Sequence, residues 1–587
     1  MIVALTAVLC LWGLDHSTYH PFYASAVRSM TGSPAAFFYG SFDPASSITL
    51  DKLPGFLWPQ ALSALLFGFH PWALVVPQAL EMTGCVLLLH LLVRRWAGVP
   101  AGLLAALFLA LTPVTVGLGR SVTEDAPFLL LLLLAAEATW RATVRARPRT
   151  LLLAGVWVGL AFQCKMLEAW AVLPALAATY LVAAPATRRR RLAHTALAGA
   201  VTVAVSLSWM LVAALTPAGA RPYLDGTTDD SPFALVVGYN FLTRFHAVGV
   251  DAAGTGSIVA SRAAHAAGRV PPGMGDGVGK MFSPGLASQT GWLYPLAAFG
   301  LAAAVLAVRR RVPRTDPLLA GQVLWGGWLA TFFTVFTFGS VTGHTYYMGV
   351  VAAALSAWAA VGAVRARRSR ALPAVLAVNV GWCVALALHY PHFAGWSAFF
   401  AAGLCLLALA LAGARRPAAF AVGLAAVLLV PAVWSASALS PRYNQPGSFG
   451  RVGPTSVRGD TTLATLGPQH RRLLGWLTTH RGGARYLAAL PGWQAAAPYV
   501  IAADAPVLPL GGYTGRVPYP APAGFHRLLD TGRLRYVVLT ARSLTERTPA
   551  AALLRWTAAH CTPVPAAAYD PADRSRLLYD CGPGHTR

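Results

Sequence analysis

The chain has 587 residues, of which 56% are hydrophobic and only 11% are charged. Ordinary soluble proteins carry about 25% charged residues, so the composition excludes that class. The net charge of +25 does not indicate nucleic-acid binding, because many basic residues form short clusters between apolar runs, as in cytoplasmic loops of membrane proteins. We therefore expect a lipid bilayer as partner and no nucleic acid. The clusters lie at residues 94–95, 141–149, 188–191, 309–314, 365–370 and 415–416.

Apolar runs long enough to cross a bilayer recur along the first three quarters of the chain, since about 20 helical residues span the hydrocarbon core. This pattern predicts an α-helical polytopic membrane protein with about 13 transmembrane helices. We expect them at residues 1–14, 72–93, 98–118, 126–141, 150–164, 166–184, 192–216, 291–308, 317–338, 346–364, 371–389, 394–413 and 417–437.

The arginine clusters also predict the orientation of these helices. If every cluster faces the cytoplasm, the N-terminus is cytoplasmic and residues after about 438 lie outside. Two spans in the stretch 150–184, rather than one kinked helix, keep the later clusters inside and bring Lys165 near the outer surface. The outer segments are then residues 15–71, 119–125, 217–290, 340–345 and 438–587.

Two domains follow from this reading. Residues 1–437 would form the transmembrane domain, with a first outer loop at 15–71 and a large outer loop at 217–290. In residues 438–587 the apolar runs shorten, and strand-like and helix-like segments alternate, which predicts a small extracytoplasmic α/β domain. Cys561 and Cys581 are the two cysteines in this part, and an oxidising compartment permits them to form a disulfide.

Candidate chemistry gathers at three places on the outer side. The first outer loop contains Asp43, Asp51 and Lys52, the segment 119–125 contains Arg120, Glu124 and Asp125, and Lys165 lies with Glu168 close by at the outer turn between the spans 150–164 and 166–184. Only three lysines occur among 46 basic residues, and two of them fall here. A lysine ammonium can hold a phosphate as a point charge. Nearby carboxylates can bind a divalent metal or accept a proton from a hydroxyl.

Each of these residues also has a structural interpretation. Acids in outer loops are usually solvated, Asp125 could be an acid at a helix N-terminus, and Lys165 could extend its ammonium towards the membrane surface. The coincidence of lysines and acids on one side of the membrane favours a shared function.

Asp51-Lys52-Leu53-Pro54 with Trp58 is similar to the Asp/Glu-Lys-Pro-Pro…Trp signature in the first outer loop of family 39 (ArnT/PMT-like) glycosyltransferases. Leu53 replaces one proline of that signature. The stretch from Phe22 to Pro44 resembles the bacterial mannosyltransferase branch. Further similar segments are Thr123-Glu124-Asp125-Ala126-Pro127, Lys165-Met166-Leu167, Arg221-Pro222-Tyr223, Gly238-Tyr239-Asn240 and His344-Thr345-Tyr346-Tyr347.

The resemblance implies a GT-C membrane enzyme that transfers a hexose, mannose first among the candidates, from a polyprenyl-phosphate donor with inversion. The acceptor would be extracytoplasmic and could be a protein, a cell-wall glycan or a lipid. Asp43 or Asp125 would deprotonate or orient the acceptor hydroxyl, and Lys52 and Lys165 would bind the donor phosphate. A divalent metal stays open as a cofactor, with Asp51 as its ligand. Further binding residues would be Tyr23, Arg120, Glu124, His344 and Tyr347.

Two other functions stay open. The chain could be a transporter or flippase of lipid-linked glycans, although we find no paired repeats with broken helices, which such proteins often contain. It could also be a degenerate family member that binds the sugar lipid without transferring the sugar. The localisation that all three share is the cell membrane.

Overall fold

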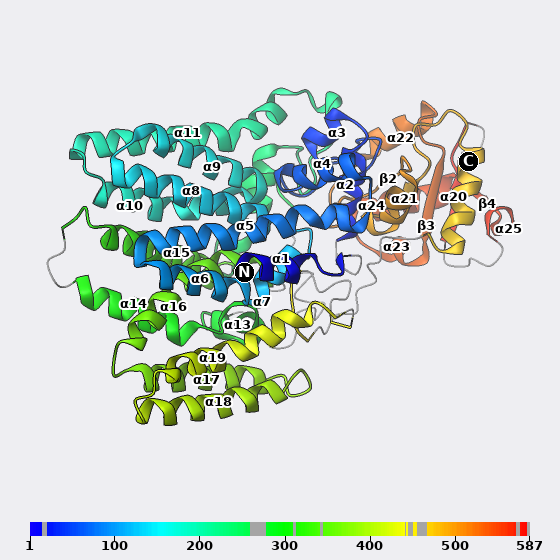
Figure 1. Ribbon diagram of the computed structural model, residues 1–587. Coiled ribbons are helices and arrows are strands. Elements are labelled where there is room, and N and C mark those ends of the chain that lie inside the picture. The colour runs from blue at the N-terminus through cyan, green and yellow to red at the C-terminus, as the bar shows by residue number, and fades with distance from the viewer. Residues whose placement is uncertain are drawn as a thin grey trace. The chain divides into compact units, whose positions relative to one another are not determined.

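The computed structural model describes residues 1–14, 20–258, 277–308, 313–340, 344–440, 442–443, 450–454, 466–570 and 576–583. Figure 1 shows long helices over most of the chain and strands near its C-terminal end. The chain forms two compact units, each assembled from separate stretches. The first comprises Met1–Thr18, Val75–Ser208 and Gly268–Gly459, and the second Tyr19–Leu74, Trp209–Ala267 and Asp460–Arg587.

The first unit is helical, and several of its helices begin with proline, whose fixed φ suits the first helical position. Helices α5 and α11 extend a few residues beyond the unit. Its helical segments are α1 (Ile2–Leu11), α5 (Pro71–Ala97), α6 (Val99–Ala110), α7 (Pro113–Gly119), α8 (Asp125–Arg145), α9 (Pro148–Lys165), η3 (Met166–Val172), α10 (Leu173–Ala183), α11 (Arg188–Leu215), η8 (Lys280–Phe282), α13 (Pro284–Thr290), α14 (Tyr294–Val308), α15 (Pro317–Phe338), η9 (Thr345–Met348), α16 (Gly349–Arg367), α17 (Leu372–Leu388), α18 (Trp396–Gly413) and α19 (Ala418–Ser437).

Among the described residues, eight helical segments are long and apolar enough to cross a membrane, or ten if each of two bent helix pairs is one span. This confirms a multi-pass helical protein, while the number of 13 stays a prediction. One of the eight segments, Pro148–Ala183, contains the break at Lys165. Leu151 and Tyr180 belong to one buried cluster, which requires α10 to return alongside α9. The geometry therefore agrees with two spans in this stretch.

Close helix contacts in this unit depend on small residues, as is common in membranes. A Cβ atom on Gly362 of α16 would lie 3.1 Å from the backbone nitrogen of Gly300 in α14. Other helix surfaces are apolar and exposed, for example Phe399 and Phe400 of α18, with 72% and 64% of their surface accessible. Such faces suit contact with lipid chains.

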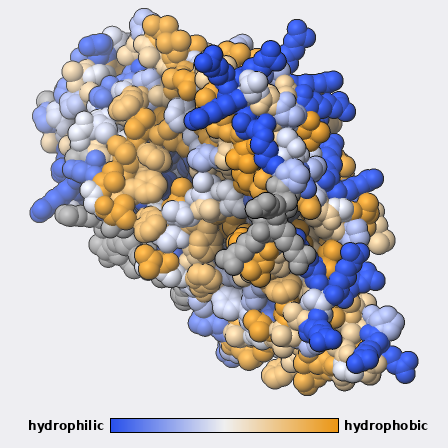
Figure 2. Space-filling model, turned by 90° about the vertical axis from the view of Figure 1, so that its left-hand side faces the viewer, coloured by the Kyte–Doolittle hydropathy of each residue, from blue (hydrophilic) through white to orange (hydrophobic). Residues whose placement is uncertain are grey.

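Exposed arginines lie at helix ends, among them Arg94 and Arg95 of α5, Arg145 of α8 and Arg367 of α16. Figure 2, which views the left-hand side of Figure 1, shows hydrophilic side chains protruding between apolar ones on that face. Cations at helix C-termini also interact favourably with the helix dipole.

The second unit combines loop segments from the first half of the chain with the C-terminal α/β region. Its helical segments before residue 460 are α2 (Pro21–Met30), α3 (Pro34–Tyr39), η2 (Pro54–Phe56), α4 (Trp58–Phe67), η4 (Ala218–Ala220), the π-helical η5 (Ala234–Tyr239), η6 (Leu242–Val248) and η7 (Ala253–Thr255). The later ones are α20 (Pro468–His480), α21 (Trp493–Ala503), α22 (Pro522–Asp530), α23 (Ala541–Thr545), α24 (Pro549–His560) and α25 (Ala566–Tyr569).

One five-stranded sheet organises the C-terminal region, which confirms the predicted small α/β fold. The strand order is β2-β1-β3-β5-β4, with β1 parallel to β2 and β3, and β5 antiparallel to β3 and β4. Its buried core includes Val537, Leu539, Phe525, Leu553 and Leu554. The strands are β1 (Ala489–Leu490), β2 (Leu508–Pro509), β3 (Tyr536–Thr540), β4 (Thr562–Val564) and β5 (Arg576–Asp580).

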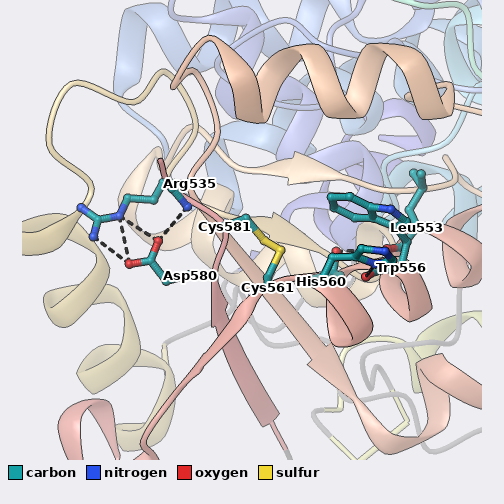
Figure 3. The surroundings of a disulfide bond; sticks show 9 residues. Arg535, Leu553, Trp556, His560, Cys561, Asp580 and Cys581 are labelled. Carbon is teal, nitrogen blue, oxygen red and sulfur yellow. Dashed lines mark hydrogen bonds and ion pairs between the residues drawn. A yellow bond between two sulfur atoms is a disulfide. The ribbon is translucent and has the colours of Figure 1, made fainter. Parts of the chain in front are cut away.

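The predicted disulfide between Cys561 and Cys581 is present (Figure 3). It connects the residue after α24 to the residue after β5 and closes a separation of 20 residues. Next to it, the guanidinium of Arg535 donates hydrogen bonds to both carboxylate oxygens of Asp580. The covalent bond and the ion pair both hold the last strand in the sheet.

The predicted boundary at residues 437 and 438 stays a prediction, because the compact units cut the chain elsewhere. The described residues leave out residues 15–19 of the first outer loop, residues 259–276 of the large outer loop and residues 309–312 of the arginine cluster 309–314.

Candidate active site

Lys52 is the centre of a buried polar cluster in the second unit. Only 8% of the residue is exposed. Its ammonium donates a hydrogen bond to the Tyr23 hydroxyl at 2.9 Å and lies 3.4 Å from Asp51 Oδ1. The Tyr23 ring centroid is 5.4 Å from the same nitrogen. Helix α2 and the turn before η2 therefore bring together the sequence candidates Tyr23, Asp51 and Lys52.

The local sequence explains this turn. Pro54 begins η2 directly after Leu53. Gly40, which packs closely against Pro54, adopts a φ of +67°. A Cβ on Gly40 would lie 2.7 Å from Pro54 Cβ, so the turn requires a residue without a side chain there. On the other side, Asn240 Nδ2 donates to the Asp51 carbonyl at 2.8 Å.

The carboxylate of Asp51 already has protein partners. One oxygen faces the Lys52 ammonium, and the other accepts a hydrogen bond from the Tyr239 hydroxyl at 3.4 Å. The adjacent ammonium of Lys52 repels a divalent cation and so disfavours its binding to Asp51. Among the described residues, no group of three or more His, Cys, Asp or Glu side chains could hold a metal ion. The residues around Asp51 therefore do not fit the metal that the resemblance left open, and we assign no step to one.

Asp43 is fully buried in the loop before Lys52. Its Oδ2 atom accepts hydrogen bonds from the backbone nitrogen of Ser47 at 2.9 Å, the Ser47 hydroxyl at 2.6 Å and the backbone nitrogen of Ile48 at 3.3 Å. Burial nevertheless raises the pKa of Asp43 to about 6, against the effect of these donors. Asp43 thus shapes the loop and also has a pKa suited to accepting a proton near neutral pH.

Lys165 is the centre of a second cluster, in the first unit. It ends α9, and Met166 after it turns the chain with a φ of +51°, a conformation that a residue with a side chain rarely adopts. The Lys165 ammonium donates to Asp125 Oδ1 and lies 3.1 Å from Glu168 Oε1. It also lies 3.7 Å from the centroid of the Tyr347 ring.

The remaining sequence candidates of this unit differ in their surroundings. Glu124 precedes α8 next to Asp125 and interacts electrostatically with it. The His344 ring stacks on Tyr347 with centroids 5.1 Å apart, so both belong to the Lys165 cluster. Arg120 instead donates hydrogen bonds to the carbonyl oxygens of residues at the end of α1, Leu9, Trp12 and Gly13. These contacts give Arg120 a structural role.

Sequence reasoning did not single out the residues of the large outer loop that support Lys52. Asp225 is fully buried and interacts electrostatically with Asp51 and Lys52, and Tyr239 and Asn240 bind Asp51 directly. An Asp-Gly pair at residues 225–226 signals a tight turn, which was the available indication. The tyrosine and the asparagine were part of the noted resemblance but carried no assigned role.

Family comparisons match two parts of the chain. Residues 51–211 match the family described as dolichyl-phosphate-mannose-protein mannosyltransferase. Residues 473–560 match the family described as putative mannosyltransferase YkcB-like, C-terminal. The first match begins at the Asp51-Lys52 pair, and the second covers most of the α/β region.

Two curated relatives are similar over almost the whole chain. "Putative mannosyltransferase YkcB" of Bacillus subtilis is 29% identical over 91% of this chain and 87% of its own length. "Putative mannosyltransferase YycA" of the same organism is 28% identical over 90% of this chain and 89% of its own length.

A solved structure shares the fold. The crystal structure of ArnT from Cupriavidus metallidurans bound to undecaprenyl phosphate has a TM-score of 0.58 and 16% identity, and covers 99% of this chain and 98% of that one. The fold and the matches point to one class: the chain is a multi-pass helical protein that is similar to glycosyltransferases of the ArnT/PMT-like GT-C type, as the resemblance predicted. Within that class, the chain is similar to the bacterial mannosyltransferase branch.

Proposed function

We propose that this chain transfers a hexose, mannose in the first instance, from a polyprenyl-phosphate donor to an extracytoplasmic acceptor, with inversion at the anomeric carbon. The names of the two Bacillus relatives support the sugar. The undecaprenyl phosphate bound to the ArnT that shares this fold supports the lipid carrier. We further propose a cytoplasmic N-terminus and an extracytoplasmic C-terminal region in the cell membrane, from the arginine clusters.

The observation that carries the proposal is the buried Lys52 ammonium beside a tyrosine hydroxyl. In the reaction, the bond between the anomeric carbon and the phosphate oxygen breaks, and a bond to the acceptor oxygen forms. The leaving polyprenyl phosphate gains negative charge, which a fixed cation in a water-poor site stabilises more than it stabilises the ground state. Lys52, hydrogen-bonded to Tyr23, is our candidate for that cation.

The acceptor hydroxyl must lose its proton, and two acids stay candidates for accepting it. Asp43 has the pKa of about 6 described above. Asp125 accepts a hydrogen bond from the Lys165 ammonium, which fixes the direction of the carboxylate, so it could orient the acceptor instead. Lys165, compensated by Asp125 and Glu168, is better suited to holding these acids than to binding a phosphate by itself.

Purified protein in lipid nanodiscs should be incubated with polyprenyl-phosphate mannose or glucose, each labelled in the sugar, together with membrane and cell-wall acceptor fractions. We expect label in an acceptor fraction and release of polyprenyl phosphate, with mannose preferred. Transfer of another sugar would show that the natural donor carries that sugar and not mannose. Movement of intact sugar lipid across the bilayer without bond cleavage would show a flippase, and donor binding without transfer would show a degenerate member.

A further inference from the structure

The C-terminal α/β region lies directly against the loop segments that hold Lys52, within one compact unit. The ring of Tyr519 stacks on Tyr223 with centroids 4.8 Å apart, and the guanidinium of Arg485 donates a hydrogen bond to the Ala45 carbonyl. Rings of Trp493 and Tyr513 pack on Phe22 of α2, with centroids 5.3 and 4.8 Å away. Segments that are hundreds of residues apart in sequence therefore share one packed interface.

Asp225 connects this region to the Lys52 turn. Its Oδ2 atom accepts a hydrogen bond from the backbone nitrogen of Tyr513 at 2.8 Å. Its own backbone nitrogen donates to the Thr49 hydroxyl at 3.1 Å, two residues before Asp51. The carboxylate interacts electrostatically with both Asp51 and Lys52.

The segment around Asp225 also forms backbone contacts with the stretch that leads into Lys52. The Thr49 nitrogen donates to the Tyr223 carbonyl at 2.8 Å, and the Tyr223 nitrogen donates to the Ser47 carbonyl at 3.0 Å. A shift of Asp225 would therefore move the backbone that presents the Lys52 side chain.

The C-terminal turn that contacts Asp225 is built from glycines. Gly511 and Gly512 have φ values of +84° and +61°, in the region that favours glycine. A Cβ atom on Gly512 would overlap the Asp225 carboxylate. Gly512 is thus required both for the turn and for the close approach of the Tyr513 backbone to Asp225.

We propose that the glycine turn at residues 511–513 positions Lys52 through Asp225, so that the C-terminal region is an integral part of the phosphate-binding site. Asp225, Gly512 and Tyr513 act as positioning residues and do not contact the phosphate. This inference rests on the proposed role of Lys52.

The chain offers a matched pair of variants for the test. Gly512 and Gly515 lie in the same turn with positive φ values of +61° and +73°, so alanine introduces similar backbone strain at both. A Cβ on Gly515 meets no atom within 4 Å, whereas one on Gly512 meets Asp225. The two variants therefore differ in what the new Cβ meets, which at Gly512 is the Asp225 carboxylate first and a methyl group of Val517 second.

Binding of undecaprenyl phosphate to full-length protein in nanodiscs should be measured for wild type, Gly512→Ala, Gly515→Ala and Asp225→Asn, together with the thermal midpoint of each. We expect Gly512→Ala and Asp225→Asn to bind on the order of 10- to 100-fold more weakly, as for a misplaced group in a preorganised site. Gly515→Ala should bind like wild type.

The possible outcomes separate the two hypotheses. Equal binding by the two glycine variants would overturn the positioning role and leave the proposed function intact. If Gly512→Ala does not fold, the binding measured for Asp225→Asn tests the positioning role by itself. Binding as tight as that of wild type would then overturn the inference. A wild-type protein that does not bind undecaprenyl phosphate would overturn the proposed function, and the inference with it.

Discussion

Lys52 is the residue on which the proposed chemistry depends most. Lys52→Ala should reduce transfer by about 100-fold or more, which is the usual cost of losing one preorganised electrostatic donor. Because the phosphate charge grows in the transition state, kcat should fall as well as donor affinity. Lys52→Arg should recover only part of the rate, since the planar guanidinium is bulkier than the ammonium. Steady-state kinetics on purified variants measures both parameters.

Lys280 provides the control for this substitution. It is equally buried, and its ammonium donates to the Gly339 carbonyl at 2.6 Å, in the other compact unit. Lys280→Ala should lower the thermal midpoint without the loss of kcat. A folded Lys52→Ala protein with wild-type transfer would show that Lys52 does not bind the donor phosphate.

The pKa of Asp43 allows a test of its role. If Asp43 accepts the proton, kcat/KM should rise with pH around a midpoint of about 6, because only the ionised carboxylate is a base. Asp43→Asn should remove this limb and lower kcat by roughly 10²- to 10⁴-fold. A profile that keeps the limb in Asp43→Asn but loses it in Asp125→Asn would assign the base to Asp125.

The same pKa has a consequence for stability. Folding raises the pKa of Asp43 from an ordinary value near 3.8 to about 6. The protonated form therefore contributes stability that is fully present below pH 3.8 and is lost as the pH rises through 6. Thermal unfolding should be compared at pH 5 and pH 8. The difference in stability between wild type and Asp43→Asn should be smaller at pH 8, because wild type has lost the contribution of the protonated carboxyl there.

The close packing of α14 and α16 makes a prediction about whole helices. Gly300→Val should force the two helices apart, because the Gly362 backbone of α16 leaves no space for a side chain at that position. Overpacking of this kind typically costs about 1 to 3 kcal/mol. Gly403→Val in α18 is the control, since a Cβ there meets no atom within 4 Å. Thermal unfolding in detergent should show a lower midpoint for the first variant only.

The helices show where sequence patterns suffice. Apolar runs predicted nearly every long helix, because a span must satisfy its backbone groups internally. They did not predict the bends of 64° between α6 and α7 and 67° between α13 and α14. The mean hydropathy of a window says nothing about the direction of the helix axis. The charge pattern, by contrast, predicted the reversal near Lys165, which the backbone places at Met166.

The candidate site was harder to predict than the helices. The rarity of charges in this chain drew attention to Lys52, Asp125 and Lys165, and the resemblance added Tyr23; their roles stay predictions. Asp225 and the glycine turn at 511–513 were missed, because their importance comes from contacts between segments that are almost 300 residues apart. Arg120, also a sequence candidate, donates hydrogen bonds to carbonyl groups of Leu9 and Trp12, and its role in binding stays a prediction.

At the scale of the whole molecule, the arginine clusters predict the topology. A reporter fused after residue 440 should be active only outside the cytoplasm, and one fused at Arg415 only inside, because loops rich in arginine stay on the cytoplasmic side. Paired alkaline phosphatase and fluorescent protein fusions at both positions measure this. A cytoplasmic signal after residue 440 would contradict the orientation and place the disulfide in a reducing compartment, where such bonds are rare.

The unit that contains Lys52 is assembled from residues 19–74, 209–267 and 460–587, which a ribosome produces at widely separated times. The loop with Lys52 emerges hundreds of residues before Tyr513, which contacts Asp225, and the disulfide closes only at Cys581. Chains cut short by premature termination or proteolysis would keep the membrane helices and lack a completed Lys52 cluster. Biogenesis of this protein therefore has a built-in order, in which a later segment completes the unit that the loop with Lys52 began.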